Sequence, residues 1–268
     1  MRVDRIELKI EGPREGKPVV MLHGWPDTCR LWNAQVEALR ERYLCVRFTL
    51  PGFDAPGAKR AYSLDEIVQT IESVVERSCQ GRRVTLLLHD WGCFFGYQFA
   101  MRRPELVERV IGVDIGDAGS RYHLVEIGTR GKLMIVAYQY WLALAWRIGG
   151  SVGDAMARWM ARRLRCPVKP ENIHASMGYP YAVRWFGVAG GLRQAKTFHP
   201  TTPMLFIYGE RKPFMFHSPA WAERLAAQPA SRVVRLPTGH WVMIGRREEF
   251  NQAVLAWLSE TDDSRRKK

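Results

Sequence analysis

The sequence predicts an α/β protein in which helices flank a mostly parallel central sheet and one helical insertion interrupts the alternation. Three observations carry this prediction. Over the first 114 residues, short apolar runs alternate with longer segments of helical periodicity. The alternation stops for about 80 residues that are helical, arginine-rich and aromatic-rich, and it then resumes. Strand–helix alternation implies parallel strands joined by right-handed crossovers.

The elements of the first part follow from local patterns. Apolar runs bounded by glycine or proline predict strands, and residues 84–90 have the unbroken apolar character of a central strand covered on both faces. Ser63 and Glu66 form a capping box, which marks the start of a helix. The expected strands are residues 17–24, 44–50, 84–90 and 109–114, and the expected helices are residues 29–42, a helix after Ser63 and residues 94–103.

The later elements divide the chain into three parts. The expected strands are residues 203–209 and 231–237, and the expected helices are residues 219–228 and 247–260. We assign residues 1–117 to the first part of the core, residues 118–199 to a helical lid and residues 200–268 to the second part of the core. Open sheets bind ligands at the carboxyl ends of their strands, so we expect the lid to cover that edge.

The charge balance is unusual for an otherwise ordinary globular composition. The chain has 47% hydrophobic and 25% charged residues, which excludes a disordered protein. Its 40 Lys and Arg against 27 Asp and Glu give a net charge of +13. Residues 119–199 hold 12 of these cations and 3 acids, so the excess lies mainly in the lid. No nucleic-acid-binding motif accompanies the charge, and we expect no nucleic-acid partner.

Other classes are excluded by simpler features. The longest apolar run, residues 133–146, is shorter than the ~20 residues that span a bilayer. The first twelve residues alternate polar and apolar side chains and do not resemble a signal peptide. Five cysteines without a CxxC spacing indicate reduced, buried thiols. We therefore expect a cytoplasmic protein that uses no cofactor and no metal.

Three strand ends carry residues that can do chemistry. The sequence HGWPD follows the first strand at residues 23–27, HDWGC ends the third strand at residues 89–93, and GHW lies at residues 239–241. In chain order these motifs supply a glycine turn, an acid on a tight strand-to-helix turn, and a histidine near the C-terminus.

These motifs resemble the α/β-hydrolase fold, and within it the branch of epoxide hydrolases and haloalkane dehalogenases. HGWPD, LPGFDAPG, LLHDWG, the helical insertion, FIYGERKP and TGH occur in order over nearly the whole chain. In that fold the nucleophile lies on a strained elbow between a strand and a helix. The resemblance implies Asp90 as the nucleophile and His240 as the base. Leu88 departs from the family, whose members commonly have Gly two residues before the nucleophile.

An aspartate nucleophile suits attack on an alkyl carbon. A carboxylate that attacks an epoxide carbon, or a carbon bearing halide, displaces the oxygen or the halide and leaves an ester. Water activated by His240 then attacks the ester carbonyl of Asp90. We expect the backbone N–H groups of Trp25 and Trp91 to form the oxyanion hole, where one donor is worth about 2.7–4 kcal/mol.

The acid partner of His240 departs from the family pattern. Lys212 stands where many members carry the acid of a G-x-x-D-P segment, and lysine cannot orient a histidine. Other members take this acid from the end of the strand before the lid, which here ends at Asp114. We therefore predict Asp114, with Glu210 and Asp117 as alternatives.

The lid is expected to supply the proton for ring opening. Epoxide hydrolases use two lid tyrosines for this step, each with an unperturbed pKa near 10. Tyr138, followed by a glutamine, resembles the first of them. The second would fall near Phe186, which has no hydroxyl, so we predict that Tyr181 takes its place, with Tyr179 as the alternative.

The sequence thus predicts an epoxide hydrolase-like enzyme of the EC 3.3.2 type that opens a hydrophobic epoxide to a diol. The expected partners are a small hydrophobic substrate and water, and the oligomeric state stays open. One alternative is a haloalkane dehalogenase-like hydrolase, for which Trp91 offers one halide donor and a second donor is not evident. The other is a non-catalytic ligand-binding protein, which Lys212 and Leu88 would explain.

The basic lid also predicts weak contact with membranes. Its cations lie beside the apolar run at residues 133–146, a combination that favours an anionic bilayer surface and a membrane-peripheral location. Cosedimentation with liposomes checks this, and the bound fraction should rise with the anionic lipid content. Binding that ignores the anionic lipid content would contradict the prediction.

Overall fold

Seven strands form a single sheet in the part of the chain that the structure describes. The structure is a computed structural model, and it describes residues 6–54 and 59–266. The strands follow the order β1-β3-β2-β4-β5-β6-β7. The edge strand β1 (Leu8–Glu11) pairs antiparallel with β3 (Tyr43–Phe48), and all other neighbours in this sheet are parallel. The mostly parallel sheet expected from the sequence is therefore confirmed.

The predicted strands lie within two residues of the observed ones. The strand β1 is not among the predicted strands; it has four residues at the edge of the sheet and is half-buried throughout. The polar–apolar alternation of the first twelve residues is the pattern of a half-buried strand, so the sequence does hold a local signal for β1. The remaining strands are β2 (Lys17–Leu22), β4 (Val84–His89), β5 (Val107–Val113), β6 (Met204–Gly209) and β7 (Arg232–Leu236).

The helices also follow the expected order. The predicted helix at residues 29–42 is a short 3₁₀ turn (Cys29–Trp32) followed by α1 (Asn33–Leu39). The capping box at Ser63 is present at the start of α2. The helices outside the β5–β6 connection are α1, α2 (Leu64–Cys79), α3 (Trp91–Arg102), α8 (Pro219–Ala226), the unpredicted short α9 (Val242–Gly245) and α10 (Arg247–Arg266).

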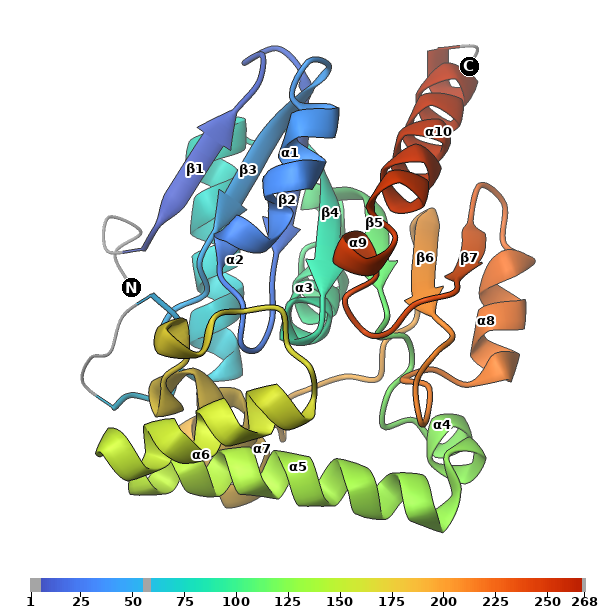
Figure 1. Cartoon of the computed structure of the whole chain (residues 1–268). Coiled ribbons are helices and arrows are strands. Elements are labelled where there is room, and N and C mark those ends of the chain that lie inside the picture. Colours follow the sequence, from blue (N-terminus) through green and yellow to red (C-terminus); the bar gives the residue numbers. More distant parts are fainter. Residues whose placement is uncertain (1–5, 55–58, 267–268) are drawn as a thin grey trace.

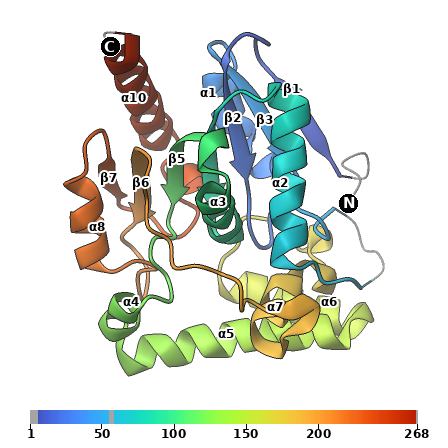
Figure 2. The same ribbon diagram turned by 180° about the vertical axis from the view of Figure 1, so that it is seen from behind.

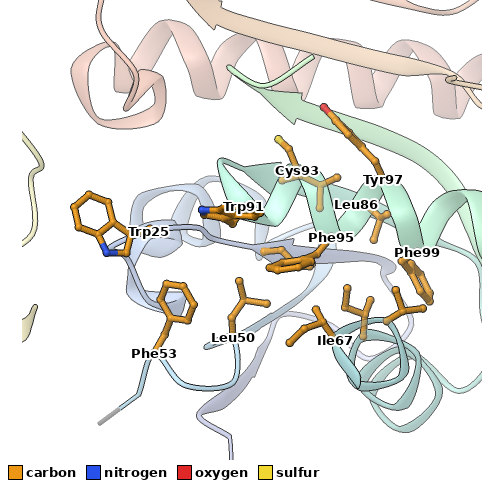
Figure 3. Close-up of a cluster of buried hydrophobic side chains, with 14 of the residues drawn as sticks. Trp25, Leu50, Phe53, Ile67, Leu86, Trp91, Cys93, Phe95, Tyr97 and Phe99 are labelled. Carbon is orange, nitrogen blue, oxygen red and sulfur yellow. The ribbon is translucent and has the colours of Figure 1, made fainter. Parts of the chain in front are cut away.

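Helices cover both faces of the sheet, so the central strands are buried on both sides (Figures 1 and 2). Two hydrophobic cores lie on opposite faces of the sheet, and successive side chains of β2 enter them alternately. Val20 and Leu22 belong to a core shared with α2 and α3, whereas Val19 and Met21 belong to a core shared with α1 and α10. Figure 3 shows part of the first core, in which the rings of Trp91 and Phe95 of α3 stack with their centroids 5.7 Å apart.

The chain between β5 and β6 is helical and lies across the end of the sheet to which the strands point (Figure 1). We refer to residues 121–190 as the helical segment; it includes α4 (Arg121–Glu126), α5 (Gly128–Ile148), α6 (Gly150–Arg163) and α7 (Tyr179–Phe186). This is the edge that the insertion was expected to cover. The division at residues 117 and 199 stays a prediction from the sequence.

The outer face of the helical segment exposes large apolar side chains. Val125 is 73% exposed, Leu133 65% and Val152 59%. Within the described residues, no helix is both long and apolar enough to cross a bilayer. All five cysteines are free thiols, and Cys166 is the one that is not fully buried.

The unusual Leu88 is accommodated by a glycine on the neighbouring helix. Leu88 is completely buried in β4. A Cβ atom on Gly96 of α3 would lie 2.4 Å from Cδ2 of Leu88, far inside van der Waals contact. The missing side chain at Gly96 therefore provides the volume that Leu88 fills.

This complementarity predicts a coupled effect on stability. Gly96→Ala should lower the free energy of unfolding by about 1–3 kcal/mol, because overpacking outweighs the helix preference of alanine. In a Leu88→Ala background the same substitution should be neutral or stabilising. Urea unfolding of the four proteins checks this. An equal cost of Gly96→Ala in both backgrounds would show that the two residues are not coupled.

Candidate active site

Asp90 lies on a strained turn between β4 and α3. Its backbone angles are φ 50° and ψ −122°, a region that non-glycine residues rarely adopt. Two glycines allow this turn to pack against the end of β2. A Cβ on Gly24 would lie 2.3 Å from Oδ2 of Asp90, and one on Gly92 would lie 2.4 Å from the carbonyl oxygen of Leu22. The turn thus presents the carboxylate above the end of the sheet.

The two oxygens of Asp90 have different surroundings. Oδ2 accepts a hydrogen bond from the backbone N–H of Trp25 at 2.7 Å. Oδ1 lies 3.7 Å from Nε2 of His240. Burial raises the pKa of Asp90, but the hydrogen bond and charge of His240 and the backbone N–H of Trp91 outweigh burial and lower it overall. Asp90 is therefore ionised at neutral pH, and Oδ1 is the oxygen that lies beside His240.

His240 joins Asp90 to Asp114. Its Nδ1 lies 2.5 Å from Oδ2 of Asp114, and because a carboxylate can only accept, Nδ1 is the donor. Burial lowers the pKa of His240, but the two carboxylates outweigh burial and raise the pKa to about 9. The imidazole is thus oriented with Nε2 toward Asp90.

Asp114 is completely buried and bound on both oxygens. Its second oxygen, Oδ1, accepts from the backbone N–H of Gly209 at 3.0 Å and forms an ion pair with Lys212. Burial raises the pKa of Asp114, but Lys212 and His240 outweigh burial and lower it to about 2. Lys212 therefore does not replace an acid; it holds Asp114 ionised beside His240.

The structure separates the three candidate acids. Asp114 contacts His240, whereas Glu210 is exposed and lies 3.9 Å from Arg235. Asp117 is buried, but it accepts hydrogen bonds from the backbone and hydroxyl of Ser218. Asp117 therefore connects the segment after β5 to the start of α8 and does not contact His240.

The two expected tyrosines lie together near Asp90. The rings of Tyr138 and Tyr181 are 6.2 Å apart, and Tyr181 also packs edge-to-face with Trp25 and Trp91, at 6.1 Å and 5.2 Å. Burial raises the pKa of both hydroxyls, so both carry their protons at neutral pH. Tyr179 instead lies in the core against Phe53, away from the cavity that the other two line.

A glutamine fixes the direction of the Tyr138 hydroxyl. The indole N–H of Trp185 donates to Oε1 of Gln139 at 3.2 Å, which leaves the amide nitrogen to donate to the Tyr138 oxygen at 3.1 Å. Because that oxygen accepts from Gln139, its own hydrogen is available to a ligand. The sequence marked Gln139 as following Tyr138, but the contact with Trp185 spans 46 residues and had no local signal.

These groups line one cavity of about 1100 Å³ between the helical segment and the loops after β6 and β7. Asp90, Tyr138, Tyr181, His240 and the side chain of Trp25 contribute to its wall. The rest is mostly apolar and aromatic. Among the described residues, no group of three His, Cys, Asp or Glu side chains is arranged to hold a metal ion.

Two further buried residues border the site. Asp27 accepts from the indole N–H of Trp241 at 2.8 Å, and burial together with the charge of Asp90 raises its pKa to about 7. His89 contacts the carbonyl oxygen of His240 at 3.2 Å. Both support the loop that carries His240. His23 braces the turn that carries Trp25: Nε2 accepts from the backbone N–H of Leu50, so Nδ1 donates to the carbonyl oxygen of Gly24, both at 2.9 Å.

Comparison with known proteins places this geometry in a family. The model of the alpha/beta hydrolase family matches residues 19–253. The chain belongs to the alpha/beta hydrolase family. The resemblance drawn from the motifs is thereby confirmed for the family and the fold.

Relatives within the alpha/beta hydrolase family include proteins named as epoxide hydrolases. Epoxide hydrolase 2 of Caenorhabditis elegans is 31% identical over 104 residues, which cover 38% of this chain and 29% of that protein. Epoxide hydrolase 3 of Xenopus tropicalis is 22% identical over 277 residues, which cover 96% of this chain and 75% of that protein. The match to the worm protein thus spans less than a third of its length.

Solved structures of the alpha/beta hydrolase family share the fold. An epoxide hydrolase from Bacillus megaterium is similar with a TM-score of 0.72 at 21% identity, covering 95% of this chain and 96% of the other. A haloalkane dehalogenase variant from Bradyrhizobium elkanii is similar with a TM-score of 0.63 at 18% identity, covering 97% and 95%. Both comparisons concern the fold alone.

The raised pKa of His240 predicts how stability depends on pH. The pKa of His240 is about 9 in the folded protein, against 6.5 for an unperturbed histidine in the unfolded chain. Protonation of His240 therefore stabilises the fold fully below pH 6.5, and this stabilisation is lost as the pH rises to 9. In His240→Gln this loss should disappear, whereas substitution of the exposed His199 by Gln should keep it. Urea unfolding between pH 6 and pH 9 measures the difference. Parallel profiles for wild type and His240→Gln would contradict the prediction.

Proposed function

We propose that this hydrolase opens an epoxide with an apolar body to a diol through an ester on Asp90. The observation that carries the proposal is the grouping of four side chains in one apolar cavity: a carboxylate, a histidine oriented by a second carboxylate, and two protonated tyrosines. This grouping supports the roles that the resemblance assigns to Asp90, His240, Asp114, Tyr138 and Tyr181.

In the first step, Oδ1 of Asp90 attacks an epoxide carbon. Oδ2 accepts from Trp25 and stays in place, so Oδ1 is the oxygen available for attack. The carbon–oxygen bond of the ring breaks, and the released oxygen takes a proton from Tyr138 or Tyr181. The products are an ester on Asp90, a free hydroxyl on the substrate and a tyrosinate that regains its proton from His240 or solvent.

The second step depends on the negative charge of Asp90, which is removed when the ester forms. Ionised Asp90 raises the pKa of His240, so ester formation lowers that pKa and leaves His240 better able to act as a base at neutral pH. Nε2 takes a proton from water, whose oxygen attacks the ester carbonyl of Asp90. The resulting oxyanion is held by the backbone N–H groups of Trp25 and Trp91. Collapse of this intermediate breaks the ester bond, and the departing diol oxygen takes the proton from His240. The carboxylic acid left on Asp90 then gives its proton to Nε2 of His240, which restores the ionised carboxylate.

A haloalkane dehalogenase reaction is the second candidate, since it uses the same nucleophile and base. Halide binding needs N–H donors that are free to face the leaving group. Trp91 packs edge-to-face against Tyr181 and does not line the cavity, so it offers no donor to a leaving group there. The pair of tyrosines favours the epoxide over the haloalkane.

A non-catalytic function has less support. It was motivated by Lys212 and Leu88, and both departures are accommodated. Lys212 pairs with Asp114, and Leu88 fills the space beside Gly96. Neither residue removes a group that the proposed reaction needs.

Trapping the ester tests the proposed reaction. Wild type incubated with phenyl glycidyl ether should release the diol, whereas His240→Gln should gain the mass of one epoxide on Asp90, because formation of the ester does not need the base. Intact-protein mass spectrometry followed by peptide mapping measures this. Asp90→Asn should gain no mass, and His199→Gln should behave as wild type. Absence of the added mass in His240→Gln, with wild type equally inactive toward a panel of epoxides, would overturn the proposal. Release of halide from haloalkanes, with no diol formed, would favour the dehalogenase instead.

A further inference from the structure

Four arginines line the same cavity as the reacting groups. Arg163 ends α6 and Arg165 follows it, Arg211 follows β6, and Arg246 lies between α9 and α10. Three separate parts of the chain thus contribute arginines to the wall of one cavity, and Arg163, Arg165 and Arg211 are exposed to solvent. Among the described lining residues, Asp90 is the one carboxylate, and its contacts are with Trp25 and His240.

Three of these arginines have no acidic partner. Arg246 lies 3.2 Å from Glu249, but no ion pair joins Arg163, Arg165 or Arg211 to a carboxylate in the described part of the chain. Arginines elsewhere in the protein are commonly paired. Such pairs are Arg47–Glu11, Arg102–Asp65, Arg103–Glu72, Arg109–Asp262 and Arg232–Glu260. The cavity therefore concentrates positive charge that the protein itself does not neutralise.

The remaining wall is apolar. It includes the side chains of Met134, Trp141, Trp159, Met160, Phe214 and Ile244. A ligand that satisfies both features has an apolar body and an anionic group. Guanidinium groups suit such a group because they bind carboxylate and phosphate through two parallel hydrogen bonds.

We propose that the arginines at residues 163, 165, 211 and 246 form an anion-binding subsite, and that the preferred epoxide carries an anionic group at a distance from its ring. This inference rests on the proposed function for the identity of the reacting group. The charge of the subsite itself does not depend on that reaction. It raises the local concentration of anionic ligands and orients them with the ring toward Asp90.

A pair of matched epoxides tests the subsite. The probes are 4-(2,3-epoxypropoxy)benzoate and the corresponding primary amide, which differ in charge but little in shape. At low salt, wild type should prefer the carboxylate in kcat/KM by roughly tenfold, the range of a charge-assisted hydrogen bond. The preference should shrink as salt screens the charges.

Variants with equal loss of charge distinguish a site from a general surface effect. Arg163→Gln with Arg211→Gln should bring the ratio of the two probes close to one. Arg162→Gln with Arg247→Gln removes two exposed arginines that do not line the cavity, and this variant should keep the wild-type ratio. Equal turnover of both probes by wild type, or equal loss of preference in both double variants, would overturn the subsite.

Binding of unreactive ligands separates this inference from the proposed reaction. Trp141 and Trp159 line the cavity, so tryptophan fluorescence can follow binding of 4-propoxybenzoate and 4-propoxybenzamide. The carboxylate should bind more tightly to wild type and lose this advantage in Arg163→Gln with Arg211→Gln. If neither epoxide is opened but the carboxylate still binds preferentially, the proposed reaction fails and the anion subsite stands. If both epoxides are opened and no carboxylate preference exists, the reaction stands and the subsite fails.

Discussion

The contact on which the site depends is the approach of two chain turns at the ends of β2 and β4. These strands pair in parallel with Leu22 opposite Leu88, so the residues that follow them meet at the same edge of the sheet. Gly24 and Gly92 have no side chains, and a Cβ atom at either would collide with the opposite turn. This close packing places the N–H of Trp25 against the carboxylate of Asp90. One constraint thus positions both the carboxylate and a donor for the charge that would develop on it.

The second organising interaction is electrostatic. Asp114 is fully buried, and such a carboxylate is tolerated only when its charge is compensated. Lys212 and the N–H of Gly209 satisfy one oxygen, and His240 satisfies the other. Lys212, which occupies the position where many family members carry the acid, therefore compensates the charge of Asp114. It keeps Asp114 ionised, although this acid follows β5 and not β6.

Much of the fold was predictable because its signals are local. Apolar runs, glycine turns and the capping box at Ser63 mark elements within a few residues of their true positions. The turn at Asp90 and the histidine at residue 240 were predictable from motif order. Two features had no such signal. The hydrogen bond from Trp185 to Gln139 links different helices, and the arginines of the cavity come from three distant segments. Their placement depends on long-range packing, which residue spacing does not encode.

The two tyrosines belong to different helices, and this has a mechanical consequence. Tyr138 and Gln139 are on α5, whereas Tyr181 and Trp185 are on α7. The spacing of the hydroxyls and the direction of the Tyr138 proton therefore both depend on how these two helices pack. Separating the helices would part the donors and release the glutamine amide from its orientation. In the proposed reaction, the packing of α5 against α7 would therefore position the proton donors, and the same two helices contribute residues to the wall of the cavity.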